Sequence, residues 1–257
     1  MEFVLPSKTN IIKEDKNLGV FEIEGLYPGY GLTVGIALRR VLLSSLPGAV
    51  ITTVKIKGVQ HEYSTIPHIK EDVIQILLNL KKIRIKTFSS EPETLILSIK
   101  GEKKVFAGDI EKNSSAEVIN PDEFIATLTD KKAELEIEMT VESGLGYVPS
   151  ELRRKEKLPV GTISLDAVFS PIKNVNYEVE DMRVGERTDY NRLRIHIETD
   201  GSLSPRQAFK KACDILNSHF QLIGDIEIPE EKVEVKGKEE KIKSEKKTEK
   251  KTKKAKK

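Results

Sequence analysis

The segment GYGLTVGIALRR, residues 29–40, carries the two features of the sequence that most directly suggest chemistry. A glycine-rich turn runs into an apolar helical segment, which is how many phosphate-binding loops begin. Two adjacent arginines, Arg39 and Arg40, follow in a stretch that is otherwise apolar enough to be buried. The segment therefore raises two hypotheses, a nucleotide-binding site or a surface that holds another protein.

The glycine spacing does not match the known phosphate-binding fingerprints. Gly29, Gly31 and Gly35 give G-x-G-x-x-x-G, and Val34 stands where the dinucleotide motif G-x-G-x-x-G needs its third glycine. The P-loop motif G-x-x-x-x-G-K-[ST] fails in every register. We therefore interpret the glycines as a tight turn and a close helix contact. A nucleotide-binding enzyme that uses the Gly29–Gly35 turn is kept as an alternative hypothesis.

The arginines lie on one side of a helix that we predict over residues 32–46, ended by Pro47 and Gly48. On a helical wheel one side consists of Ile36, Arg39, Arg40 and Leu43, and the other of Val34, Leu38 and Val41. Buried arginines need partners. Either both pair with acidic residues of their own chain, or they present guanidinium groups to another protein.

No catalytic or metal-binding constellation stands out. The single cysteine, Cys213, excludes an internal disulfide and a multi-cysteine zinc site, and we interpret it as a small core residue. The four histidines are scattered without metal-ligand spacing. We expect no catalytic residue, no metal and no cofactor.

A second apolar helix is predicted at residues 205–223. Ser204, Pro205 and Gln207 form a capping box with proline at the first helical position. One core does not easily absorb two helices this apolar, so we expect a homodimer through paired helices. The stripe at helical spacing includes Phe209, Ala212, Leu216, Phe220 and Ile223.

The region between the helices is rich in predicted strands, which makes the fold class α+β. Residues 51–64 read as a strand, 93–110 as a hairpin, and 133–144 alternate between apolar and acidic side chains. Residues 146–163 are charged and read as a loop.

The C-terminal segment differs from the rest of the chain in composition. Residues 230–257 hold 13 lysines and 7 glutamates, a net charge of +6 in a chain of +2, so the remainder is about −4. We predict that residues 229–257 are disordered. A further hypothesis is a nucleic-acid-binding protein that acts through this basic tail. The acidic remainder of the chain is a poor duplex-binding surface. No signal peptide or membrane span is evident, so a soluble, cytoplasmic protein is expected.

Four segments together closely resemble one family. They are GYGLTVGIALRRVLLSSLPG, GVQHEYSTIPHIKEDVIQILLNLKKI, GYVPSELRR and ERTDYNRLRIHIETDGSLSPRQAF. The chain resembles the α subunits of bacterial-type DNA-directed RNA polymerase, in order and with similar spacing over residues 1–228. This resemblance implies a cytoplasmic, nucleoid-associated assembly subunit of a nucleotidyltransferase, with the catalytic chemistry in the large subunits.

The resemblance also implies a domain organisation and partners. A discontinuous dimerisation domain, two main helices on a sheet, would comprise residues 1–47 and 171–228, with an inserted, mostly β domain at 48–170. The homodimer would scaffold the β and β′ subunits, followed by ω and σ. The β subunit would meet Arg39, Arg40, Leu43, His61 and Glu62, and weaker candidates for large-subunit contacts are Arg153, Arg187 and Asp189. The helices at 32–46 and 205–223 would form the dimer interface through Val34, Leu38, Val41, Phe209, Ala212, Leu216, Phe220 and Ile223.

Two departures from the family pattern qualify these expectations. Ile36 replaces the usual asparagine of G-N-A-L-R-R, which removes a polar group near the arginines. The Lys/Glu-rich tail stands where the family has its C-terminal DNA-binding domain, so we expect DNA contact only indirectly, or weakly through the tail.

Overall fold

The structure, a computed structural model, describes residues 5–89, 91–153 and 159–225. The predicted disordered tail at residues 229–257 lies outside the described residues. Among the described residues, the chain up to His219 forms one compact unit, and residues 220–225 lie outside that unit. The fold is mixed, with many strands and few helices, so the predicted α+β class is confirmed.

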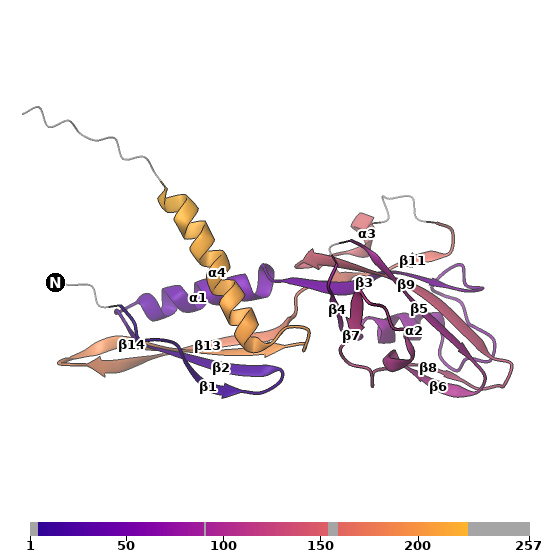
Figure 1. Ribbon diagram of the computed structural model, residues 1–257, viewed down its shortest axis with the longest axis horizontal. Coiled ribbons are helices and arrows are strands. Elements are labelled where there is room, and N and C mark those ends of the chain that lie inside the picture. Colours follow the sequence, from indigo (N-terminus) through magenta and orange to yellow (C-terminus); the bar gives the residue numbers. More distant parts are fainter. Residues whose placement is uncertain (1–4, 90, 154–158, 226–257) are drawn as a thin grey trace, which may run out of the picture. The chain divides into compact units, whose positions relative to one another are not determined.

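A four-stranded antiparallel sheet carries the two main helices (Figure 1). Its order is β1-β2-β14-β13, with β1 Asn10–Glu14, β2 Leu18–Leu26, β13 Ile172–Val184 and β14 Arg187–Thr199. Along β14, Leu193, Ile195 and Ile197 are fully buried on the face that meets the helices, and the charged residues between them face the other way. The period-two pattern of the sequence therefore produces one apolar and one charged face.

Helices α1 (Tyr30–Ser44) and α4 (Pro205–Gly224) pack on the apolar face of this sheet. The ring of Phe209 in α4 stacks on Phe21 of β2 at a centroid distance of 4.7 Å. The predicted capping box of α4 is confirmed, since the Gln207 amide donates to Ser204 Oγ and the Ser204 amide to Gln207 Oε1. We call these four strands and α1 with α4 up to His219 the two-helix part.

The β-rich part is the region between β3 and β12. Its main sheet runs β5-β9-β3-β4-β7, with β11 paired to β3. These strands are β3 Pro47–Ile56, β4 Ile85–Thr87, β5 Glu93–Lys100, β7 Ala116–Val118, β9 Glu134–Leu145 and β11 Thr162–Ser164. Helix α2 (Val73–Leu80) is capped by the Asp72 carboxylate, which accepts from the Gln75 amide, and it packs in the hydrophobic cluster of this sheet.

The remaining elements of the β-rich part are short. They are β6 Lys103–Phe106, the 3-10 turn Ala107–Asp109, β8 Phe124–Leu128, β10 Tyr147–Val148, α3 Ser150–Arg153 and β12 Ala167–Val168. Strand β6 pairs with β8, and β10 with β12. The segment predicted as a loop at 146–163 therefore contains short ordered elements at its described ends.

Two predictions for the β-rich part are wrong. The predicted hairpin at 93–110 contains two strands, but β5 pairs with β9 and β6 with β8. The predicted strand at 51–64 ends at Ile56, and Gly58 adopts a positive φ of 79° that breaks the extended chain. The first error arises because the pairing partners of β5 and β6 are distant in sequence, and the second arises because the chain turns at Gly58. In the described part of the chain, no helix is long and apolar enough to cross a membrane.

Candidate docking and dimerisation surfaces

The turn before α1 is fixed by a side chain from the sheet. Gly29 has a left-handed φ of 86°, and its amide donates to Asn191 Oδ1 at 2.9 Å. Asn191 is 7% exposed and donates in turn to Asp181 Oδ1 at 3.0 Å. Asn191 was not among the residues predicted from the sequence. Its place in the alternation with Leu193, Ile195 and Ile197, as a polar residue on the apolar face, is the signal that could have revealed it.

The other two glycines let α1 approach the sheet closely. A Cβ atom at Gly31 would lie 2.7 Å from Val179 Cγ1, and one at Gly35 would lie 2.9 Å from the Tyr177 ring. Both distances are shorter than a van der Waals contact between carbon atoms. The interpretation of these glycines as a turn and a close helix contact is confirmed.

The side of α1 that faces away from the sheet carries the arginine pair. Arg39 and Arg40 are exposed, and beside them the apolar side chains of Ile36 and Leu43 are 41% and 39% exposed. Within the described part of the chain, neither Arg39 nor Arg40 forms an ion pair. This observation disfavours the hypothesis that the two arginines are neutralised by acidic residues of their own chain.

The arginines of β14 behave differently. Arg192 lies 2.9 Å from a Glu24 carboxylate oxygen, and Arg194 lies 2.7 Å from Glu22. Hydrogen bonding to Glu22 raises the pKa of Arg194 above its ordinary value. These arginines of β14 have acidic partners across the sheet, whereas Arg39 and Arg40 have none within the described part of the chain.

The residues predicted for the dimer interface differ in how deeply they are buried. Leu38 and Ala212 are 3% and 0% exposed and pack within the core of the two-helix part. Val34, Val41, Phe209 and Leu216 are partly buried against the same core. Leu38 and Ala212 are thus positioned to support the surface from below, and the four partly buried residues lie at its border.

The described C-terminal end of α4 is apolar and exposed. Phe220, Leu222 and Ile223 are 65%, 78% and 66% exposed. These residues are not needed to complete a core of the described chain, since apolar side chains at such exposures bury little of their surface. The predicted interface residues Phe220 and Ile223 are therefore available to another chain.

The other predicted contact residues lie apart from α1 in the sequence and in different elements. His61 is exposed and Glu62 half-buried in the turns that follow β3, where Ser64 Oγ donates to the His61 carbonyl at 2.8 Å. Arg153 ends the short helix α3. These residues belong to the β-rich part, whereas Arg39, Arg40 and Leu43 belong to the two-helix part.

Arg187 and Asp189 form a bidentate pair at the start of β14. Arg187 Nε and Nη2 donate to the two Asp189 oxygens at 3.0 and 2.7 Å. The guanidinium carbon also lies 5.5 Å from the ring centre of Tyr27 and 5.4 Å from that of Tyr190, both within cation–π range. Hydrogen bonding lowers the pKa of Asp189 and raises that of Arg187. The two tyrosines were not among the residues predicted from the sequence.

Among the described residues, no cluster of three or more His, Cys, Asp or Glu side chains could hold a metal ion.

The chain matches a known family of proteins. Residues 54–170 match the family described as the RNA polymerase Rpb3/RpoA insert domain. This match places a recognised polymerase insert domain in the β-rich part, in agreement with the predicted β-rich insertion.

RNA polymerase α subunits match most of the length of the chain. The chain is 45% identical over 228 residues to the DNA-directed RNA polymerase subunit alpha of Symbiobacterium thermophilum, which covers 89% of this chain and 72% of the relative. It is 47% identical over 225 residues to that of Roseiflexus castenholzii, covering 88% and 69%. For the subunit of Bacteroides fragilis the identity is 44% over 243 residues, covering 93% and 73%.

The fold and the comparisons define a polymerase subunit of the α class. The chain belongs to the family of DNA-directed RNA polymerase α subunits, and the resemblance found in the sequence is confirmed.

Proposed function

We propose that this chain is a non-catalytic assembly subunit of DNA-directed RNA polymerase, which forms a homodimer and scaffolds the β and β′ subunits. The observation that carries the proposal is the exposed arginine pair on an apolar helix side without acidic partners in the described part of the chain. Guanidinium groups desolvated by a partner bind carboxylates or carbonyls in fixed geometry, and arginine is enriched in such interfaces.

The exposed end of α4 supports the homodimer. Its three large apolar side chains add to the partly buried residues of α1 and α4, and a second copy would supply the apolar surface that covers them. The proposed dimer interface comprises Val34, Val41, Phe209, Leu216, Phe220 and Ile223, and it is supported from below by Leu38 and Ala212, which are buried in the core of the chain.

In this proposal the chain consists of two domains with different roles. Residues 1–47 and 171–228 form the dimerisation domain, and residues 48–170 form the inserted domain. The presence of two separate hydrophobic clusters, one under α1 and α4 and one in the β-rich part, supports this division. His61 and Glu62 contribute to β-subunit docking, Arg153, Arg187 and Asp189 add large-subunit contacts, and ω and σ join afterwards.

Substitution of Arg40 tests the docking surface. Arg40→Ala removes an exposed guanidinium that has no described ion-pair partner, so the chain stays folded but captures about tenfold less β subunit, as expected for loss of an interface arginine. The measurement is recovery of the β subunit with the tagged chain during purification. Arg206→Ala, at an exposed position in the first turn of α4, is the matched control.

Recovery of β at the wild-type level with Arg40→Ala would contradict the proposal. Arg40→Lys refines it, because lysine keeps the charge but not the planar fork and should restore only part of the binding. Equilibrium dialysis of the isolated chain with ATP and NAD tests the nucleotide-binding alternative. Tight binding would favour that alternative.

A further inference from the structure

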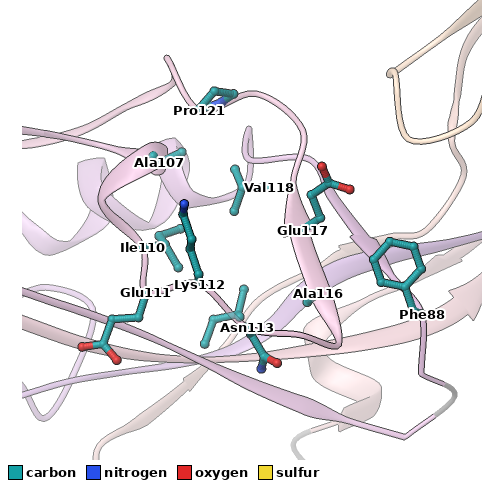
Figure 2. A pocket seen from close by; sticks show the side chains of 12 residues that line it. Phe88, Ala107, Ile110, Glu111, Lys112, Asn113, Ala116, Glu117, Val118 and Pro121 are labelled. Atoms are coloured by element: carbon teal, nitrogen blue, oxygen red, sulfur yellow. The ribbon is translucent and has the colours of Figure 1, made fainter.

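A hollow of about 470 Å³ lies in the β-rich part, between strand β7 and residues 107–113 (Figure 2). This volume is within the range of protein ligand sites. Leu95 of β5 and Ala116 of β7 both line it, although these two strands stand at opposite ends of the sheet order β5-β9-β3-β4-β7. The sheet therefore curves so that both of its ends meet this hollow.

One wall of the hollow is the end strand of this sheet. Among the described strands β7 pairs with β4 alone, and the hydrogen bonds that flank the pairing use the Ser115 carbonyl and the Ile119 amide. In an antiparallel strand the residues that bond one neighbour alternate with those that face the other side. The amides and carbonyls of Ala116 and Val118 thus face away from β4, as donors and acceptors on a strand edge.

The opposite wall already has its backbone partners. The Glu111 amide donates to the Ile96 carbonyl of β5 at 2.9 Å, and Asn113 Nδ2 donates to the Thr94 carbonyl at 3.5 Å. Residues 111–113 therefore cover the edge of β5 beside the hollow. Among the described residues, the uncovered strand edge beside the hollow is therefore that of β7, where an added strand would meet the free backbone groups of Ala116 and Val118.

The hollow is apolar inside and carries a cation. Ala107 and Ile110 are 0% and 6% exposed, and Phe88 is 64% exposed at its border. Figure 2 shows the Lys112 side chain extending across the hollow toward Ala107, whereas Glu111 and Glu117 direct their carboxylates away from it. Within the described part of the chain, Lys112 has no ion-pair partner.

We propose that this hollow binds an extended segment of another protein, which adds to β7 as a strand and places a carboxylate side chain against Lys112. The backbone bonds would come from Ala116 and Val118, as in other cases of strand addition. The charge of Lys112 selects an acidic segment over a basic one. This binding is independent of the arginine surface of α1.

Panning a randomised peptide phage library on the full chain tests the proposal. Peptides enriched on the wild-type chain should share an aspartate or glutamate. In fluorescence anisotropy with the most enriched peptide, Lys112→Glu should weaken binding about tenfold or more, because it replaces a charge-assisted hydrogen bond by repulsion. Lys104→Glu makes the same charge change at an exposed position outside the hollow and should leave binding within about twofold.

Val118→Pro tests strand addition separately. Proline removes the amide that faces the hollow, and it is tolerated on a strand edge whose N–H is not used by the neighbouring strand. Binding should fall about tenfold. Because Val118 is partly buried against the core cluster, the unfolding midpoint should fall somewhat, and a cooperative unfolding transition shows that the variant is folded. If Lys112→Glu weakens binding but the folded Val118→Pro variant does not, the hollow takes a side chain only and strand addition is wrong. Absence of enrichment, or enrichment of peptides without acidic residues, overturns the proposal as a whole.

Discussion

At the scale of single residues, the glycines of α1 determine how closely this helix lies on its sheet. The absence of a side chain at Gly31 and Gly35 leaves room for Val179, Tyr177 and Leu193. A glycine inside a helix costs conformational entropy, which the close packing must offset. The pattern that resembles a phosphate loop is therefore explained by packing.

Gly35→Val should destabilise the chain. Its Cβ would lie 2.9 Å from the Tyr177 ring and 3.1 Å from Leu193 Cδ1, so helix or sheet must move. We expect a loss of about 1–3 kcal/mol in the free energy of unfolding, the usual cost of overpacking a core. Thr33→Val introduces the same side chain at an exposed position of the same helix and is the control. Equal unfolding midpoints for the two variants would contradict this account.

Cys213 offers a second test at the residue scale. It is half-buried among the residues of α4, and burial raises the pKa of its thiol. Because the thiolate is the reactive form, Cys213 should react with a disulfide reagent at pH 8 much more slowly in the native chain than in denaturant. Equal rates in the two conditions would show that the thiol is accessible in the folded state.

At the scale of elements, Asp166 holds three short segments of the β-rich part together. Its Oδ1 accepts from the Ser150 amide at the start of α3 at 3.0 Å, and its Oδ2 lies 3.2 Å from Lys81 Nζ at the end of α2. The Ser150 hydrogen bond, followed by Lys81, lowers the pKa of Asp166. The attachment of α3 therefore depends on an ionised carboxylate.

The pH dependence of this attachment follows from the sign of the shift. A folded-state pKa below the unfolded value means that the contribution is complete above the unfolded pKa, about 4, and is lost as pH falls through the folded value. The Ser150 amide resonance should accordingly shift with the protonation of Asp166 below about pH 4. Asp166→Asn should abolish that shift. An amide resonance that does not change with pH would contradict the role of Asp166.

At the scale of the whole molecule, the exposed end of α4 supports the proposed homodimer. Three large apolar side chains, Phe220, Leu222 and Ile223, stand mostly in solvent in the single chain. Their exposure costs solvation free energy that a second copy of the chain would remove. The oligomeric state is therefore the property that distinguishes an assembly subunit from a monomeric protein.

Phe220→Glu should convert the proposed dimer to a monomer. A charge placed in a buried apolar interface needs a partner that the surface does not provide. The dissociation constant of the dimer should therefore rise by about tenfold or more. Sedimentation equilibrium measures the change. Asn217→Glu, an exposed polar position on the same helix, is the control. A wild-type chain that is monomeric at micromolar concentration would overturn the homodimer proposal.

Much of the architecture could be predicted from local sequence. The alternation in β9 and β14, the helix of α1 and the capping box of α4 depend on neighbouring residues, and all are present in the structure. The pairing of β5 and β6 could not be predicted in this way. Their true partners, β9 and β8, lie elsewhere in the chain, and short strands pair where their buried faces meet.

The sequence by itself determined the family, the fold class and the side of α1 that carries Arg39 and Arg40, because motif order and helical period are properties of consecutive residues. Only the tertiary structure identified the partners of the glycines before and within α1: the Asn191 side chain at Gly29 and the Tyr177 ring at Gly35. It also decided that Arg192 and Arg194 of β14 have ion-pair partners, whereas the arginines of α1 have none among the described residues. The physical reason is that ion pairs and close packing depend on residues far apart in the chain, whose distances folding alone sets.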